Sequence, residues 1–214
     1  MKFVFFDLDG TLTDPGIGIT NSVMYALNKF GIEVKDRTEL YPFIGPPLIP
    51  SFMNHYGFSK EDAVKAVVFY REYYAERGIF ENKLYPGVPE LLAKLKDDGV
   101  KIVMATSKPE IFAEKIAEHY DIAKYFDLIA GATENETRTE KDEVIAYALE
   151  KLENPPSGKI TMVGDRFYDV KGAAKFGIPT IGVLYGYGDE KELTDAGAYA
   201  VAKTPEEVYI KLQK

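Results

Sequence analysis

The sequence lacks several features that particular classes of protein require. None of its 214 residues is a cysteine, which excludes disulfides and thiol catalysis and is compatible with a reducing compartment. Acidic residues outnumber basic ones by 34 to 26, and a net charge of −8 argues against binding nucleic-acid polymers, which needs a basic surface. The apolar run near the start is shorter than the core of a signal peptide, and no run approaches the roughly 20 apolar residues of a membrane span. We therefore expect a cytoplasmic protein with no membrane or nucleic-acid partner.

The first part of the chain indicates a helical domain. The content of hydrophobic residues (46%) and charged residues (28%) is ordinary for a globular protein, and the length suffices for one core and a second, smaller one. Residues 15–80 show no strand-like alternation. The segment 21–31 has apolar residues at helical spacing, and 59–78 begins with Ser-x-x-Asp, a pattern typical of a helix N-terminus. We predict an all-helical domain over residues 15–81.

The rest of the chain indicates an α/β domain. Strand-like and helical segments alternate from residue 85 onward, which is typical of a parallel sheet with crossover helices. We therefore predict a Rossmann-like parallel-sheet core, built from residues 1–14 and 82–214. The predicted strands cover residues 100–105, 127–132, 159–163, 179–184 and 198–202; the predicted helices cover 89–96, 109–119, 142–152, 170–176 and a segment from 205.

Two carboxylates follow the first predicted strand. The apolar run Phe3 to Phe6 is typical of a strand buried on both faces, and it ends in Asp7-Leu8-Asp9-Gly10. Two acids at the end of a buried strand repel each other and lose hydration, so a cation or a function must compensate for them. Ligands of open α/β sheets bind at the carboxyl ends of the strands. As residues i and i+2 of a strand share a side, both acids can serve one ligand only if the chain bends at Gly10.

Further polar residues follow other predicted strands. Thr106-Ser107-Lys108 follows the second, Gly164-Asp165 ends the fourth with Asp169 four residues later, and Lys141 begins the helix after the third. A parallel sheet brings these ends to one edge. Carboxylates there can hold Mg²⁺, while a hydroxyl, a lysine and turn amides can bind a phosphate. One free carboxylate can attack phosphorus, and the second can protonate the leaving oxygen and then activate water.

These motifs resemble those of the haloacid dehalogenase (HAD) superfamily of phosphohydrolases. Asp7-Leu8-Asp9-Gly10-Thr11-Leu12 is similar to the first motif, Thr106 to the second, Lys141 to the third and Gly164-Asp165-x-x-x-Asp169 to the fourth. The resemblance covers the whole chain in order. It implies that Asp7 is the nucleophile and a Mg²⁺ ligand.

The resemblance also implies roles for the other acids. Asp9 is the acid/base and gives its backbone carbonyl to the metal, and Asp165 is the third protein ligand. Asp169 supports the site from outside, orienting Lys141 or a metal-bound water.

The phosphate-binding residues implied by the resemblance are Thr106, the amide of Ser107, and Lys141, which also stabilises Asp7. The helical block resembles a cap that closes over the site and excludes water. Leu84-Tyr85-Pro86-Gly87-Val88 and Thr106-Ser107-Lys108-Pro109 resemble the phosphoglycolate phosphatase-like branch, some of whose members are 5′-nucleotidases or pyrophosphatases. Ser107 departs from the Asn that is frequent there, which leaves the amide role intact.

The expected activity is therefore Mg²⁺-dependent hydrolysis of a small phosphorylated metabolite, phosphoglycolate or a 5′-nucleotide, through an aspartyl-phosphate, by a monomer or homodimer. A phosphomutase, a non-catalytic phosphoacceptor and a binding protein with a vestigial site stay open as alternatives. Arg138 is a second candidate beside Lys141, since both lie in one charged run and only the resemblance favours Lys141.

Overall fold

The structure, a computed structural model, describes residues 2–133 and 137–213. Contacts along the chain divide it into two compact units. Unit 1 consists of Met1–Asp14 and Leu84–Lys214, and unit 2 of Pro15–Lys83. Across the described residues, no helix has both the length and the apolar character needed to cross a bilayer.

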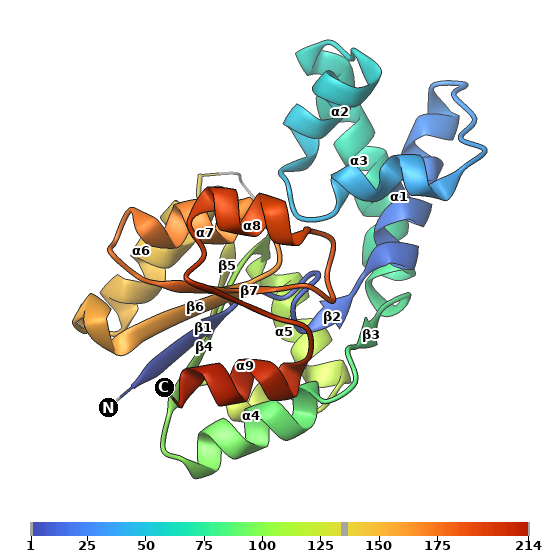
Figure 1. The fold of residues 1–214 in the computed structure, drawn as a ribbon. Helices are drawn as coiled ribbons and strands as arrows, with labels where there is room; N and C mark the ends of the chain where they lie inside the picture. The colour runs from blue at the N-terminus through green and yellow to red at the C-terminus, as the bar shows by residue number, and fades with distance from the viewer. Residues whose placement is uncertain (1, 134–136, 214) are drawn as a thin grey trace. The chain divides into compact units, whose positions relative to one another are not determined.

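Unit 1 is built on a six-stranded sheet whose neighbouring strands are all parallel (Figure 1). The strand order is β5-β4-β1-β6-β7-β8, so the chain's first strand lies between β4 and β6. The bounds are β1 Phe3–Phe6, β4 Lys101–Pro109, β5 Leu128–Ala132, β6 Ile160–Gly164, β7 Thr180–Val183 and β8 Ala200–Ala202. Strands β2 (Thr13–Asp14) and β3 (Lys83–Leu84) form a separate two-stranded sheet. The predicted α/β class with a parallel sheet is confirmed.

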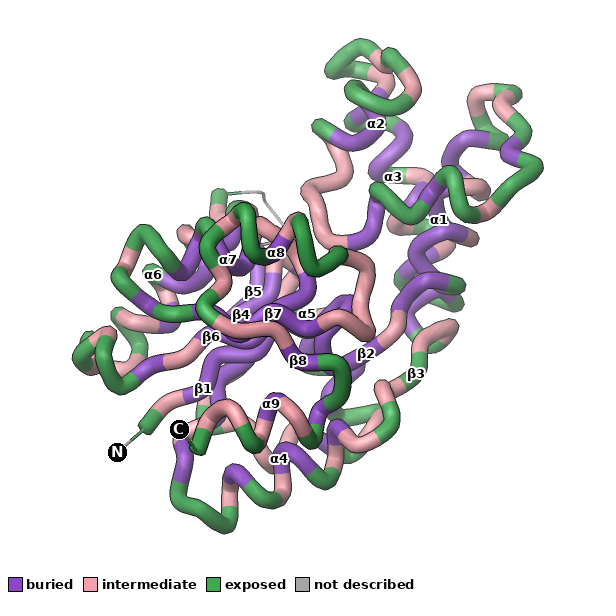
Figure 2. The backbone as a smooth tube through the Cα atoms, in the orientation of Figure 1, coloured by how far each residue is buried: buried purple, intermediate pink, exposed green. Residues whose placement is uncertain are grey.

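Helices cover both faces of this sheet. Helices α6, α7 and α8 lie on one face and α4 and α9 on the other (Figure 1), while α5 packs on β4 and β5. The bounds are α4 Val88–Asp97, α5 Glu110–His119, α6 Lys141–Lys151, α7 Phe167–Ala174, α8 Glu190–Ala196 and α9 Pro205–Leu212. Because both faces are covered, β1, β4, β5, β6 and β7 are buried along most of their length, as Figure 2 shows in purple. Phe5, Val103 and Met162, from three neighbouring strands, belong to one fully buried cluster.

Strand β4 differs most from its prediction. It was expected to end at residue 105, with a helix from 109, but it continues to Pro109 and α5 begins at Glu110. Its register with β5 shifts between Ala105 and Pro109. The sequence did not indicate this extension, because the apolar run that is typical of a buried strand is interrupted by the polar residues Thr106, Ser107 and Lys108.

Unit 2 consists mainly of helices. Its bounds are α1 Gly16–Lys29, α2 Leu48–Tyr56 and α3 Lys60–Glu76, with 3₁₀ turns at Arg37–Phe43 and Gly78–Phe80. Helix α3 begins as its sequence indicates: the Ser59 side chain accepts a hydrogen bond from the amide of Asp62 at 3.1 Å. Helices α1 and α3 pack against each other, and their buried residues include Val23 and Leu27 of α1 and Ala66, Tyr70 and Tyr74 of α3.

The sequence prediction gives no bounds for two of the helices: α2, which lies within the predicted all-helical domain, and α8. Helix α2 follows two prolines and contains Pro50, which a helix tolerates only in its first turn, so the start of this helix is not apparent from the sequence. Helix α8 buries only Leu193 and therefore has no apolar stripe to reveal it.

Candidate active site

The turn after β1 brings the backbone of the first motif against Asp165. The amides of Leu12 and Thr13 both donate to the Leu8 carbonyl, at 2.9 and 3.0 Å, and Gly10 donates to Thr13 at 2.8 Å. Gly10 has a φ of +81°, and a Cβ at this position would lie 2.1 Å from Asp165 Oδ2. Only glycine fits both the left-handed conformation and the close approach.

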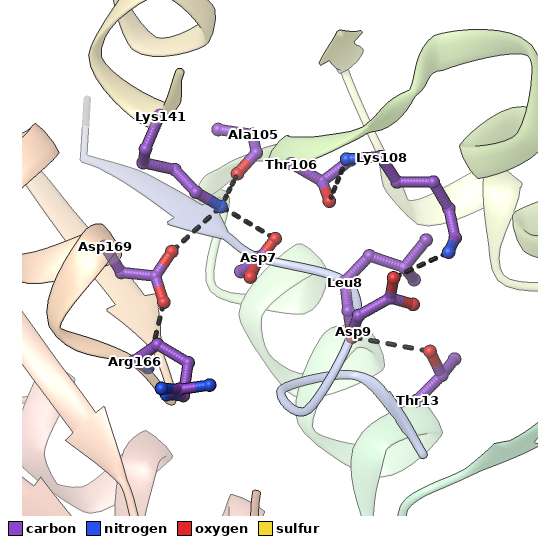
Figure 3. A network of polar contacts seen from close by, with 10 residues as sticks. All are labelled: Asp7, Leu8, Asp9, Thr13, Ala105, Thr106, Lys108, Lys141, Arg166 and Asp169. Atoms are coloured by element: carbon purple, nitrogen blue, oxygen red, sulfur yellow. Dashed lines mark hydrogen bonds and ion pairs between the residues drawn. The ribbon is translucent and has the colours of Figure 1, made fainter. Parts of the chain in front are cut away.

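Lys141 connects two of the predicted acids. It is the first residue of α6, and its buried ammonium lies 2.8 Å from Asp7 Oδ1 and 2.8 Å from Asp169 Oδ1, and donates to the Ala105 carbonyl at 3.0 Å (Figure 3). Burial alone would lower the pKa of Lys141, but the charges of Asp169 and Asp7 outweigh it and raise that pKa. The lysine is therefore a fixed positive charge beside Asp7.

Three buried carboxylates form a potential cation site. Asp7, Asp165 and Asp169 each offer an oxygen atom, and these atoms lie within 4.8 Å of one another. Burial and the neighbouring charges of Asp169 and Asp7 raise the pKa of Asp165 well above its ordinary value. One lysine cannot neutralise three carboxylates, so the group as it stands is short of positive charge.

The hydrogen bonds indicate which of these acids is available to a metal. Asp169 Oδ1 is paired with Lys141, and its Oδ2 accepts from the amide of Arg166 at 3.1 Å. Asp165 Oδ2 accepts from the amide of Tyr187 at 2.8 Å, whereas its Oδ1 is buried and has no hydrogen-bond partner in the part of the chain that the structure describes. A buried carboxylate oxygen without a partner is costly, and a hard divalent cation would satisfy it. Asp7 and Asp165 therefore fit a Mg²⁺ site.

Asp9 lies in a different environment from Asp7. Its side chain is outside the three-carboxylate group, and its Oδ2 is 2.6 Å from the ammonium of Lys108, with both side chains buried (Figure 3). Burial raises the pKa of Asp9, and the ion pair with Lys108 only partly opposes this, so the protonated form is favoured relative to a solvated aspartate. The two acids of the first motif thus have different partners, Lys141 for Asp7 and Lys108 for Asp9.

Sequence reasoning left Lys108 out of the site. Thr106, which was expected there, is buried, and its Oγ1 accepts from the amide of Lys108 at 3.2 Å. Ser107 lies between them and is partly exposed. Had β4 been extended past Thr106, the alternation of side chains along a strand would have put Lys108 on the same side as Thr106.

Arg138, the second candidate for the role given to Lys141, belongs to another network of contacts. Its guanidinium pairs with Glu110 at 3.0 Å, donates to the Gly131 carbonyl at 2.8 Å and lies over the ring of Tyr147. Lys141 is the residue of this charged run that contacts Asp7.

A glycine-rich loop after β7 was also missed. A Cβ at Gly186 would lie 2.2 Å from the Gly10 carbonyl oxygen, and one at Gly188 would lie 2.0 Å from the Asp165 carbonyl oxygen. Between them, Tyr187 donates its amide to Asp165 and its hydroxyl to Asp14 Oδ1. The alternation of tyrosine and glycine over residues 185–188 is the sequence signal that could have revealed this close packing.

Comparison with known families decides the class of protein that carries this site. The model of the haloacid dehalogenase-like hydrolases matches residues 4–183, a range that contains every acid described above. The chain belongs to this family. Its relatives place it in the phosphatase branch, as the sequence motifs predict.

Individual relatives resemble nearly the whole chain. A 5′-nucleotidase from Pseudomonas aeruginosa is 45% identical over 190 residues, covering 89% of this chain and 86% of that protein. The crystal structure of a predicted phosphatase from Clostridium acetobutylicum has a TM-score of 0.96 and 48% identity, and the match covers 99% of this chain and 98% of the other. The tyrosine-protein kinase PtkA of Mycobacterium tuberculosis is 42% identical over 187 residues, which are 87% of this chain but 63% of that protein.

Proposed function

We propose that this hydrolase is a Mg²⁺-dependent phosphomonoesterase that acts on small phosphorylated metabolites through an aspartyl-phosphate on Asp7. The observation that carries the proposal is the separation of the two acids of the first motif. Asp7 is paired with Lys141 inside the three-carboxylate group, and Asp9 is paired with Lys108 outside it. A nucleophile and an acid/base need such distinct surroundings.

Mg²⁺ would be held by Asp7, Asp165 and the backbone carbonyl of Asp9. When bound, it would neutralise negative charge and orient the phosphoryl group. The unpartnered Asp165 Oδ1 supports this assignment, because a buried carboxylate rarely keeps an oxygen without a partner. Asp169, which is bound to Lys141 and to the amide of Arg166, is proposed to hold the lysine in place.

The chemistry would proceed in two steps. First, a carboxylate oxygen of Asp7 forms a bond to phosphorus while the bond from phosphorus to the leaving oxygen breaks, and Asp9 gives that oxygen a proton. Then Asp9 takes a proton from water, whose oxygen forms a bond to phosphorus as the bond to Asp7 breaks. Throughout, Lys141, the Thr106 hydroxyl and the Ser107 amide would bind the phosphoryl oxygens.

Unit 2 is proposed to be the cap of this enzyme and to select the substrate. It is inserted between the first and second motifs and contains three helices. The first substrates to test are 5′-nucleotides, because a relative that matches 89% of this chain is named a 5′-nucleotidase. Phosphoglycolate is second, since a relative from Vibrio parahaemolyticus at 26% identity is named a phosphoglycolate phosphatase.

A panel of phosphate esters tests the proposal. The protein is incubated with Mg²⁺ and AMP, phosphoglycolate, pyrophosphate or p-nitrophenyl phosphate, and inorganic phosphate is measured. Phosphate release that Asp7→Asn abolishes supports a phosphatase. A phosphoryl group moved to another position of the substrate without phosphate release indicates a mutase, and a stable phosphoprotein without turnover indicates a phosphoacceptor; either result overturns the proposal.

A further inference from the structure

The ion pair between Lys108 and Asp9 is the strongest feature that the family motifs leave without a role. Its atoms, Lys108 Nζ and Asp9 Oδ2, are 2.6 Å apart, and the side chains are only 5% and 10% exposed. The partners are 99 positions apart in the chain, one on the turn after β1 and the other in the last part of β4. A buried ion pair of this kind adds little net stability over apolar residues of the same shape, so a reason other than stability is needed.

The two oxygens of Asp9 are not equivalent. Oδ2 is held by Lys108, whereas Oδ1 is buried and has no hydrogen-bond partner among residues 2–133 and 137–213 (Figure 3). A carboxyl group fixed through one oxygen cannot turn freely about its χ2 bond. The atom left to exchange a proton with a reacting group is therefore Oδ1.

We propose that Lys108 is a positioning residue that fixes the Asp9 carboxyl group and selects Oδ1 as its proton-transferring atom. This inference rests on the proposed phosphatase activity. In the first step, the Oδ1–H bond breaks and its proton goes to the leaving oxygen as the phosphorus–oxygen bond breaks. The carboxylate that results remains paired with the ammonium of Lys108, which offsets the new negative charge.

A leaving-group comparison separates positioning from general stabilisation. An alkyl leaving group, such as the ribose of AMP, needs a proton to depart, but p-nitrophenolate departs without one. The value of kcat/KM reports steps up to departure of the leaving group, before the hydrolysis that both substrates share. A residue that acts through the acid should therefore affect AMP and phosphoglycolate much more than p-nitrophenyl phosphate.

The test compares Lys108→Met with Lys101→Met. Lys101 is a matched control because it lies in the same strand and pairs with Asp127 at 2.6 Å, but far along β4 and partly exposed. For Lys108→Met we expect kcat/KM for AMP and phosphoglycolate to fall by about 10²-fold and that for p-nitrophenyl phosphate by about threefold or less, since misplacing a reacting group costs rates of this order. Lys101→Met should leave the ratio between substrates unchanged.

Asp9→Asn provides an independent check. If Lys108 acts through Asp9, adding Lys108→Met to Asp9→Asn should lower the AMP rate no further. Melting temperatures of all variants monitor folding, and if Lys108→Met fails to fold, Lys108→Gln takes its place. Equal losses on all substrates, or losses that add fully to those of Asp9→Asn, would refute the positioning role while leaving the phosphatase intact. Absence of wild-type activity on every substrate would instead contradict the proposed function.

Discussion

Replacing Asp165 with asparagine should stabilise the metal-free protein and remove its response to Mg²⁺. Asp165 is buried, and its carboxylate lies within 4.8 Å of oxygens of Asp7 and Asp169. Lys141 offsets one of those two negative charges. The net electrostatic repulsion that the Asp165 carboxylate experiences is therefore close to that from one negative charge at this distance. Asparagine keeps the shape of the side chain and an oxygen that can accept from the amide of Tyr187.

The size of the gain follows from Coulomb's law. One like charge at 4.8 Å costs about 3 kcal/mol at an effective dielectric constant of about 20. Weakening of the hydrogen bond to Tyr187 opposes this by about 1 kcal/mol. We expect Asp165→Asn to raise the free energy of unfolding of the metal-free protein by about 1–3 kcal/mol. For a chain of this length, that corresponds to a rise in Tm of about 3–10 °C.

The assay is thermal unfolding in EDTA and in excess Mg²⁺. Wild type should gain stability with Mg²⁺ because the ion binds the folded state, and Asp165→Asn should not. Asp127→Asn is the matched control, because Asp127 lies in the same unit but its carboxylate is stabilised by ion pairs with Lys96 and Lys101 and by the amide of Ile102. Loss of this negative charge should therefore lower Tm. A lower Tm for Asp165→Asn in EDTA, or a Mg²⁺ response equal to that of wild type, would refute the reasoning.

Four further outcomes are expected. Asp7→Asn should reduce phosphate release by about 10³-fold or more with an unchanged circular dichroism spectrum; near-normal turnover would exclude its role as nucleophile. EDTA should stop phosphate release and Mg²⁺ should restore it, whereas activity that persists in chelator would exclude the metal. Gly10→Ala should lower the free energy of unfolding, measured with urea, by about 1–2 kcal/mol because of the left-handed backbone at this position alone. It should also abolish the stabilisation by Mg²⁺, because the added Cβ would displace Asp165, and a variant that Mg²⁺ still stabilises would contradict this. Burial raises the pKa of Asp165 in the folded protein above its value of about 4 in the unfolded chain, so this residue increasingly destabilises the metal-free wild type as pH rises above 4. The difference in Tm between Asp165→Asn and wild type should therefore grow from pH 4 to pH 7. A difference that does not change with pH would count against the charge repulsion.

The central acids could be placed from the sequence because one simple rule applies to them. Asp7 and Asp165 directly follow short apolar runs, and such runs become parallel strands with their carboxyl ends at one edge. Lys141 was harder to place, since it lies in a charged run with Arg138. Only the structure shows that Arg138 is engaged by Glu110, leaving Lys141 to contact Asp7.

Contacts between distant segments could not be predicted in this way. The pairing of Lys108 with Asp9 depends on how far β4 continues beyond its apolar part, which no local pattern reports. The hydrogen bond from the backbone amide of Tyr187 to the Asp165 carboxylate depends on two glycines that let a loop approach another backbone closely. In both cases a tertiary contact decides the conformation, and local propensity does not.

The position of β1 in the middle of the sheet has a consequence for how this protein is made. Its two neighbours, β4 and β6, begin about 100 and 160 residues later in the chain, so Asp7 leaves the ribosome long before Lys141 and Asp169 are synthesised. During synthesis the three acids can therefore meet only after Lys141, which precedes Asp165 and Asp169 in the chain and pairs with Asp7 and Asp169, has been made. The order of synthesis therefore separates these carboxylates in the early nascent chain. Their repulsion arises only once the domain is complete, where a divalent ion can neutralise it.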